Sequence, residues 1–400
     1  MNEPKLRFKG FEGEWESISI EEVSPLQGGF AFQSTSFRKY GIPIVRISNI
    51  LNTGEIGGAF IFYKGVVPSQ YSLSQGDAVI AMSGATTGKT AVVKDNGFYY
   101  LNQRVGKFAR TGKIYYPFVA TYIQSYYFVS KLQNLLSSSA QPNISTSDVN
   151  SIQINVPTDK AEQRKIATYF THLDTLIEAS RQKVEKLKQV KAASLQSLFP
   201  THGQRTPKIR FKGFEGEWKV VKLGEMYERR NERNDLTYGV DKIISVANMY
   251  FRGDSVVSSI DYLRSYNIFK LGDIAFEGNK SKNFAHGRFV ENSIGDGIVS
   301  HVFVVLKRKD SAYDLNFWKY YINNERIMGP ILGRCTKAST MMNDIVVDDF
   351  LKESVLVPSL EEQQKIGKYL STLDTLLTLE RQRYAKLQQV KRASLTQMFA

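Results

Sequence analysis

The chain has 400 residues, of which 42% are hydrophobic and 12% aromatic, and its formal net charge is +14. This length is too great for one ordinary hydrophobic core and predicts at least two domains. No apolar run approaches the ~20 residues that span a bilayer, and the sequence starts without a signal-peptide core. These features exclude a membrane-spanning class and predict a cytoplasmic protein.

Charge and cysteine content narrow the classes of function further. Cys335 is the single cysteine, which excludes an intrachain disulfide and a cysteine-based metal site. The histidines are scattered, so a metal site has little support. The positive charge is spread along the chain, which is typical of proteins that bind nucleic acid. A basic surface that only maintains solubility explains the charge equally well.

The opening segment 4–15, PKLRFKGFEGEW, returns at 207–218 as PKIRFKGFEGEW. A second pair of related segments lies at 162–199 and 362–399. The chain is therefore two tandem units, and such repeats decide the fold. Two related units in one chain are usually related by a pseudo-twofold axis.

Each unit has a variable body between its opening motif and its long segment, at 16–156 and 219–357. Runs of β-branched and aromatic residues predict strands, and longer amphipathic stretches predict helices at 116–136 and 314–332. The strand candidates are 42–50, 78–82, 242–250 and 299–307. Gly-Asp turns and later Gly-Lys or Gly-Arg pairs occupy corresponding places, at 76–77 and 272–273 and then at 88–89 and 287–288. We therefore predict two α+β bodies with one fold and different surfaces.

The segments 162–199 and 362–399 have apolar residues at alternating steps of three and four, the pattern of a coiled-coil seam. Each makes a helix of roughly 55 Å. A narrow helix of this length cannot bury its apolar stripe on itself, so each copy is the expected partner of the other. The charged outer face of the first copy, which includes Arg164, Lys165, Arg181 and Lys186, is either a solvated surface or a docking surface for partner subunits.

Polar and basic side chains suited to DNA concentrate at the same loop positions of both bodies. Arg and Lys can pair with guanine edges, while Asn and Gln suit adenine. Each residue alone is equally an ordinary loop residue. The candidates in the first body are Arg46, Ser48, Asn49, Thr86, Thr87, Lys89, Gln103, Arg104, Gln141, Asn143 and Ser145. Those in the second body are Asn248, Asn279, Lys280, Lys282, Asn283, Arg288, Ser300, His301, Lys337, Ser339 and Thr340.

Catalysis finds little support in the sequence. The run GATTGKT at 84–90 has three residues between its glycines, whereas a phosphate-binding loop needs four, so ATP binding is not expected. No nucleophile elbow, HExxH helix or dinucleotide fingerprint is present. Asp77 and Asp273 are expected to form turns rather than act as acids. We predict no catalytic residue, metal or cofactor in this chain.

Together, the GFEGEW motifs, the GD…G(K/R) bodies, the VP followed by EQ(R/Q)KI and the LDTL of each helix resemble the specificity subunit of Type I restriction-modification systems. The resemblance covers nearly the whole chain. It implies two globular target-recognition domains, 1–158 and 201–358, separated by two long helices, 159–200 and 359–400, that pack antiparallel. The second body departs from the pattern where RCTKASTMMNDI replaces AQPNIS.

The same resemblance implies a non-catalytic subunit that binds double-stranded DNA and reads one half of a bipartite sequence with each domain. Partners would be two modification subunits that methylate adenine, together with restriction subunits. S-adenosylmethionine, ATP and Mg would be bound by these partners. The helices would act as a ruler for the gap, since two modules fixed at the ends of a rigid element have a geometrically defined half-site spacing.

Three other functions are compatible with parts of the sequence. A bivalent DNA-binding regulator would use the same two modules without modification partners. A stand-alone methyltransferase or nuclease would need a catalytic motif that the sequence does not show. A purely structural coiled-coil adaptor would leave the two divergent bodies without a role. The order of preference is specificity subunit, regulator, enzyme, adaptor.

Overall fold

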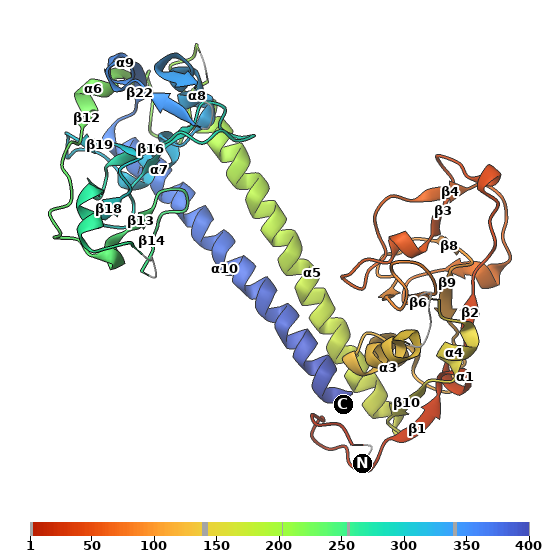
Figure 1. Ribbon diagram of the computed structural model, residues 1–400. Helices are drawn as coiled ribbons and strands as arrows, with labels where there is room; N and C mark the ends of the chain where they lie inside the picture. Colours follow the sequence, from red (N-terminus) through yellow and green to blue (C-terminus); the bar gives the residue numbers. More distant parts are fainter. Residues whose placement is uncertain (1–2, 138–142, 202, 254–256, 339–341, 400) are drawn as a thin grey trace. The chain divides into compact units, whose positions relative to one another are not determined.

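The computed structural model describes residues 3–137, 143–201, 203–253, 257–338 and 342–399 (Figure 1). It divides into two compact units. Unit 1 comprises Met1–Arg181 and Gln382–Ala400, and unit 2 comprises Gln182–Arg381. The long helices α5 (Lys160–Ser197) and α10 (Leu360–Met398) are each divided between the units. Each unit therefore contains one body, half of its own long helix and half of the other.

Two four-stranded sheets form the body of unit 1. The first is antiparallel with the order β2-β9-β6-β7, from β2 (Leu26–Gly28), β6 (Ala78–Ala81), β7 (Thr90–Val92) and β9 (Val105–Phe108). The second has the order β4-β3-β8-β5, from β3 (Ile42–Val45), β4 (Ile61–Tyr63), β5 (Ser72–Leu73) and β8 (Tyr99–Leu101). Its strands β3 and β8 run parallel. The antiparallel pair of β1 (Glu16–Ser19) and β10 (Gln153–Val156) leads into α5.

The body of unit 2 repeats this strand order. Its four-stranded sheet, β12-β19-β16-β17, is formed by β12 (Tyr227–Arg229), β16 (Ile274–Glu277), β17 (Arg288–Glu291) and β19 (Val304–Arg308). The pairs β13 (Ile244–Ser245) with β14 (Tyr250–Phe251) and β15 (Asn267–Phe269) with β18 (Gly297–Val299) are linked by a parallel bridge between Ile243 and Ile298. The antiparallel pair of β11 (Lys219–Lys222) and β22 (Ser354–Val357) leads into α10. The predicted α+β class and internal repeat are confirmed.

Short helices pack beside the sheets in both bodies. Unit 1 has α1 (Ile20–Val23), α2 (Tyr116–Tyr122), α3 (Tyr126–Ser137) and α4 (Thr146–Asn150). Unit 2 has α6 (Leu223–Met226), α7 (Leu315–Tyr321), α8 (Glu325–Cys335) and α9 (Val347–Lys352), with the hairpin β20 (Thr336–Ala338) and β21 (Asn343–Ile345). The predicted helix 116–136 is two helices, because Ser125 donates to the Tyr122 carbonyl and its Oγ accepts from the Phe128 N–H. The predicted helix 314–332 divides in the same way.

Three predicted strands are shorter than the sequence pattern indicated. The run 42–50 pairs only as far as Val45, because residues 47–49 form a 3-10 turn. The run 242–250 pairs at Ile244–Ser245 and again at Tyr250. The run 299–307 joins the end of β18 to β19 through a turn at Ser300–Phe303. In the first two of these turns, Ile47 and Val246 pack against the core without strand pairing, whereas Val302 in the third is 55% exposed.

The core of unit 1 includes the end of the second long helix. Phe399 is 2% exposed, and its ring lies 5.0 Å from that of Tyr122 and 5.6 Å from that of Phe118. Unit 2 shows the reciprocal arrangement, in which Phe199 packs 5.7 Å from Phe317 and 5.8 Å from Tyr321. Each body is therefore completed by the aromatic residue that follows the other body's helix.

The helix halves run antiparallel within each unit. In unit 1, the Tyr169 hydroxyl lies 3.0 Å from the Ser394 hydroxyl. Further along α5, Asp174 accepts a hydrogen bond from Lys391, which precedes Ser394 in α10. In unit 2, Ser194 contacts Tyr369 at 3.1 Å. Among the residues that the structure describes, no helix is both long and apolar enough to cross a membrane.

Candidate nucleic-acid interface

The loop between β6 and β7 is the centre of a group of loops in unit 1. Ser83 forms an isolated antiparallel bridge with Asn143. The Met82 N–H donates to the Arg104 carbonyl at 2.9 Å, and the Met82 carbonyl accepts from the Ile144 N–H at 2.9 Å. Backbone hydrogen bonds therefore fix three segments that are distant in sequence around one strand end.

The turn after β3 joins the same group. The Asn102 N–H donates to the Val45 carbonyl at 3.1 Å, and the Thr86 hydroxyl donates to the Ile47 carbonyl at 3.1 Å. We call the assembly loop cluster 1, defined as residues 46–49, 83–89, 102–104 and 143–145. It contains every first-body candidate except Gln141, which lies outside the described residues. The hydrogen bonds around Met82 and Thr86 bring these loops together, and contact of their side chains with DNA stays a prediction.

The side chain of Asn49 has a structural role. It is 1% exposed, its Oδ1 accepts from the Arg46 N–H at 3.1 Å, and its Nδ2 donates to the carbonyls of Gly57 and Ala59. An amide with its donors and acceptor satisfied inside the protein has none left for a base. The prediction of Asn49 as a reader of adenine is therefore corrected: this residue holds the turn that presents Arg46.

Other first-body candidates differ in how freely they are presented. Thr86 and Thr87 donate to the carbonyls of Ile47 and Gly84, so their hydroxyls tie the loop together. Ser145 caps α4, since its Oγ accepts from the Asp148 N–H at 3.0 Å. The remaining candidates are partly or fully exposed, and their side chains form no hydrogen bond with other described residues: Arg46, Ser48, Lys89, Gln103, Arg104 and Asn143.

Unit 2 has a corresponding loop cluster 2, defined as residues 247–248, 278–288 and 343 together with 300–301, which occupy the position after β18 that 102–103 occupy after β8. The Asn343 N–H donates to the Gly278 carbonyl at 2.9 Å, and its Nδ2 donates to the Ala285 carbonyl at 3.2 Å. Arg288 Nη2 donates to the Ala247 carbonyl at 3.0 Å. The exposed candidates here are Asn248, Asn279, Lys280, Lys282, Asn283 and His301, with Ser300 half-buried.

Three candidates of the second body lie apart from this group or beyond description. Lys337 is exposed on β20, where its backbone pairs with Asp344 of β21. Ser339 and Thr340 lie outside the described residues. Asn343, which sequence reasoning missed, is 4% exposed and anchors the β16–β17 loop. Its backbone bond to Gly278 corresponds to that from Ile144 to Met82, so a polar residue stands where the first body has an apolar one, and the local sequence carries no signal for this role.

The two clusters differ in the state of their cations. Gly88 and Gly287 occupy the same turn position, with φ of +82° and +81°, and this explains why glycine precedes the cation in both bodies. Arg288 donates from Nε to Glu277 Oε2 at 2.7 Å, so its charge is neutralised within the loop. Lys89 has no carboxylate partner among the described residues. The same turn therefore carries a cation without a carboxylate partner among the described residues in unit 1, and an ion pair in unit 2.

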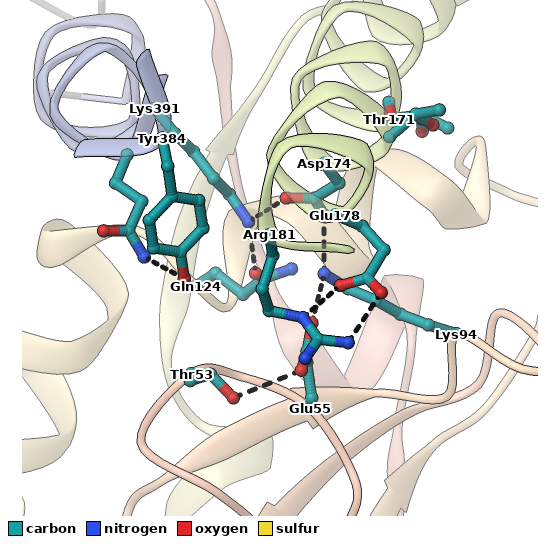
Figure 2. Close-up of polar contacts among 12 residues, drawn as sticks. Thr53, Glu55, Lys94, Gln124, Thr171, Asp174, Glu178, Arg181, Tyr384 and Lys391 are labelled. Atoms are coloured by element: carbon teal, nitrogen blue, oxygen red, sulfur yellow. Dashed lines mark hydrogen bonds and ion pairs between the residues drawn. The ribbon is translucent and has the colours of Figure 1, made fainter. Parts of the chain in front are cut away.

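A network of ion pairs ties the first body to its helices (Figure 2). Lys391 donates to Asp174 at 2.6 Å and to Gln124 at 3.1 Å, while Lys94 contacts Asp174 at 3.5 Å and Glu55 at 3.1 Å. The network borders a groove of about 600 Å³ that Thr87, Gly88 and Lys89 also line. The loop that carries Thr87 and Lys89 is therefore held beside the helix pair of unit 1.

The opening motifs clamp the starts of both long helices. Arg7 donates from Nε and Nη2 to the two oxygens of Glu162, each at 2.8 Å, and Glu162 is 1% exposed. Arg210 holds Glu362 at 2.8 and 2.7 Å in the same way. This bidentate geometry is a strong, directional form of ion pair. It explains why the RFKGFEGEW run is repeated so closely when the bodies differ.

The chain is similar in sequence to known Type I specificity subunits. A family model described as the Type I restriction modification DNA specificity domain matches residues 12–189 and 215–389. The MjaVIII specificity subunit of Methanocaldococcus jannaschii is 30% identical over 213 residues, 50% of this chain and 47% of that protein. The EcoBI specificity subunit of Escherichia coli is 27% identical over 179 residues, 44% of this chain and 36% of that protein. The chain thus spans less than half of the length of these curated relatives.

A solved structure described as a Type I restriction-modification S subunit from M. genitalium superposes with a TM-score of 0.62. The superposition covers 100% of this chain and 99% of that one, at 13% sequence identity. At this identity the likeness shows the fold. It extends over both bodies and both long helices rather than one repeat.

Proposed function

Because the chain belongs to the Type I restriction modification DNA specificity domain family, we propose that it is the DNA recognition subunit of a Type I restriction-modification complex. In this proposal loop cluster 1 reads one half of a bipartite target and loop cluster 2 reads the other. Adenine methylation or restriction is then directed by partner subunits to sites that carry both halves. A cytoplasmic location, where these partners meet DNA, is part of the proposal.

One observation carries the proposal. The two bodies have the same strand order, and they present different side chains at corresponding loop positions. The parallel bridges pair Ile44 with Tyr100 in unit 1 and Ile243 with Ile298 in unit 2, which aligns Arg46 with Ser245. Contacts with base edges determine which sequence is bound, while the rest of the domain positions those contacts on the DNA. Two domains that recognise different sequences therefore need the same fold with different side chains on the DNA-binding surface.

The catalytic steps belong to partners in this proposal. The chain would dock two modification subunits, which bind S-adenosylmethionine, and restriction subunits that use ATP and Mg. This chain itself would bind the DNA and place the complex at the correct position on the target sequence. The long helices would set the gap between the half-sites.

Long-read sequencing of modified bases in the host genome tests the proposal. With this gene present, we expect methylated adenines in one bipartite motif, and deletion of the gene removes that methylation. An unchanged methylation pattern after deletion would contradict the proposal. Methylation of DNA by the purified chain alone, in the presence of S-adenosylmethionine, would favour an enzyme. Binding of a bipartite site with no modification subunit recovered in a pull-down would favour a regulator.

Replacing a body tests the assignment of one half-site to each. Exchange of residues 16–156 for the corresponding segment of another family member should change one half of the methylated motif. The other half and the gap should stay as they are. A change in both halves would contradict one reader per body.

A further inference from the structure

We propose that Arg46 reads a guanine in the first half-site and is the main specificity-determining side chain of loop cluster 1. Unit 2 presents no equivalent free guanidinium among its described residues, so the two half-sites should differ at this position. The inference rests on the proposed function and deepens it. Three observations support it: the way Arg46 is held, the absence of a side-chain partner for it among the described residues, and the contrast with unit 2.

The backbone of Arg46 is fixed from two sides. Asn49 Oδ1 accepts the Arg46 N–H at 3.1 Å, and Asn49 is itself buried and bonded to two further carbonyls. The carbonyl of the next residue, Ile47, accepts a hydrogen bond from the Thr86 hydroxyl at 3.1 Å. A side chain that starts from a backbone position fixed in this way loses less freedom when it binds a ligand.

Within the part of the chain that the structure describes, the guanidinium of Arg46 has no hydrogen-bond or ion-pair partner. Its Nε is shielded from solvent and has no hydrogen-bond acceptor among the described residues, while the residue as a whole stays partly exposed. Ser83 Oγ, in the same cluster, is also buried without a partner among those residues. A buried polar group without a partner is unfavourable, and a ligand that supplies an acceptor relieves this cost.

Arginines elsewhere in the chain show how unusual this is. Arg7, Arg230 and Arg308 are largely buried, and each is paired with a carboxylate. No carboxylate lies within ion-pair distance of Arg46 among the described residues. Since the protein neutralises its other enclosed guanidinium groups, the open charge of Arg46 points to an acceptor outside the chain.

Unit 2 has no arginine at the position that corresponds to Arg46. Ser245 stands where unit 1 has Arg46, by the equivalence of the parallel bridges. The neighbouring Ala247 carbonyl accepts from Arg288, whose charge is held by Glu277. The guanidinium that reaches this point in unit 2 therefore comes from β17 and is already occupied.

The geometry of the Arg46 guanidinium group favours guanine over the other bases. A guanidinium presents parallel N–H donors that match the O6 and N7 acceptors of guanine in the major groove. Phosphate contacts, by contrast, need only positive charge or N–H groups and carry no sequence information. Lys89, whose charge is also unpaired among the described residues, is a suitable phosphate contact beside it.

The test compares the methylated motifs of cells that express the wild-type chain, Arg46→Gln, Arg46→Lys or the control Arg38→Gln. Arg38 is exposed in the same body, and its guanidinium donates to the carbonyls of Thr35 and Phe37. We expect the wild-type motif to contain a guanine in one half-site. Preference for that guanine should fall roughly ten- to a hundredfold in Arg46→Gln. Arg46→Lys should fall less, and Arg38→Gln should match the wild type. The other half-site and the gap should be unchanged.

Several outcomes would overturn the inference. An unchanged motif in Arg46→Gln is one, and a uniform loss at all sites without relaxed specificity, as expected of a phosphate contact, is another. If Arg46→Gln abolishes methylation, selection of bound sequences from random DNA by the complex containing Arg46→Lys decides the point, and undiminished guanine selection counts against the inference. A wild-type chain that directs no methylated motif would overturn the proposed function itself and this inference with it.

Discussion

Lys391 donates a hydrogen bond to Asp174, with 2.6 Å between Nζ and Oδ1, and so joins the two long helices within unit 1. Lys191 and Asp374 form the same pair in unit 2. The second carboxylate oxygen is used differently in the two units. Lys94 approaches Asp174 Oδ2 at 3.5 Å, whereas the Tyr320 hydroxyl donates to Asp374 Oδ2 at 2.6 Å. The same helix contact therefore holds each body by a different partner.

Replacement of Asp174 should weaken unit 1. Asp174→Asn removes the charge that faces both Lys391 and Lys94, and these groups are only partly exposed. We expect the free energy of unfolding to fall by about 1 kcal/mol, measured by urea unfolding at low salt, with a smaller loss at high salt. Asp349→Asn removes the exposed Lys352 pair and should have almost no effect. Equal losses in the two variants would contradict this view of the network.

The ion pair between Arg7 and Glu162 should contribute more to the free energy of unfolding than the pairs of Asp174 do. Arg7→Leu leaves the Glu162 carboxylate at 1% exposure without its cation, so we expect a loss of about 3–5 kcal/mol. Arg210→Leu should have a similar effect in unit 2. The double variant Arg7→Met with Glu162→Leu should recover most of the stability, because no buried charge remains. If the double variant is as unstable as Arg7→Leu, packing rather than charge explains the clamp.

Glu291 should make unit 2 less stable as pH rises. Burial raises the pKa of Glu291 well above its usual value, against the opposing charges of Arg308 and Lys319, while Asp314 adds to the rise. Neither carboxyl oxygen has a hydrogen-bond partner among the described residues. The folded state therefore keeps a proton that the unfolded chain releases above pH ~4.5. The free energy of unfolding should consequently fall as pH increases from that value towards the folded-state pKa.

The register of the sheets supplies the control for this prediction. Ile274 pairs with Glu291 as Ala78 pairs with Val92, so valine is the first body's residue at this position. Glu291→Val should raise the free energy of unfolding by about 1–3 kcal/mol at pH 8 and change it little at pH 4. A pH dependence that survives in Glu291→Val would assign the effect to another group.

Phe399 should stabilise the first body although it lies at the far end of the sequence from it. Phe399→Ala removes a ring that packs on Tyr122, Phe118 and Trp15, at a cost of about 3–5 kcal/mol. Hydrogen exchange should then increase at 116–122 and leave 315–321 unchanged. Phe199→Ala should give the reverse pattern. Equal changes in both segments would contradict the exchange of helix ends.

Insertions in the long helices test the ruler. Added or deleted residues in 180–190 together with 380–390 should change the gap of the methylated motif and leave both half-sites intact, because the readers themselves are not altered. The measurement is the motif in the host genome. A matched insertion in the linker 201–208 should leave the gap unchanged. An altered half-site with the original gap would count against the helices as spacers.

The sequence was sufficient to predict the repeat and the long helices. The predicted helix 162–199 corresponds to Lys160–Ser197, and 362–399 corresponds to Leu360–Met398, because their periodicity is long and uninterrupted by proline. The sequence divisions at 158, 200 and 358 do not coincide with the compact units, which cut through both helices. A periodic stripe shows that a helix needs a partner, but it does not show which half packs against which body.

Individual candidate residues were harder to predict. Asn49 and Asn143 both fit the composition of a reading loop, yet one is buried and bonded while the other is exposed. They are distinguished by contacts with the loop that follows, such as those from Asn49 to Gly57 and Ala59. Arg288 likewise fits the composition of a DNA-binding loop, but it forms an ion pair with Glu277 across β16 and β17. Local sequence gives the type of side chain, and the strand register decides whether it is free.

The division of the helices between the units has a consequence for synthesis on the ribosome. Unit 2 is continuous in sequence, from Gln182 to Arg381, whereas unit 1 needs residues 382–399 to complete its core. Domains usually fold in the order in which they emerge, the N-terminal one first. Here the first body to emerge is the last to close, and its apolar surface around Phe118 and Tyr122 waits for Phe399. The nascent first body is thus expected to expose apolar surface until residues 382–399 have been synthesised.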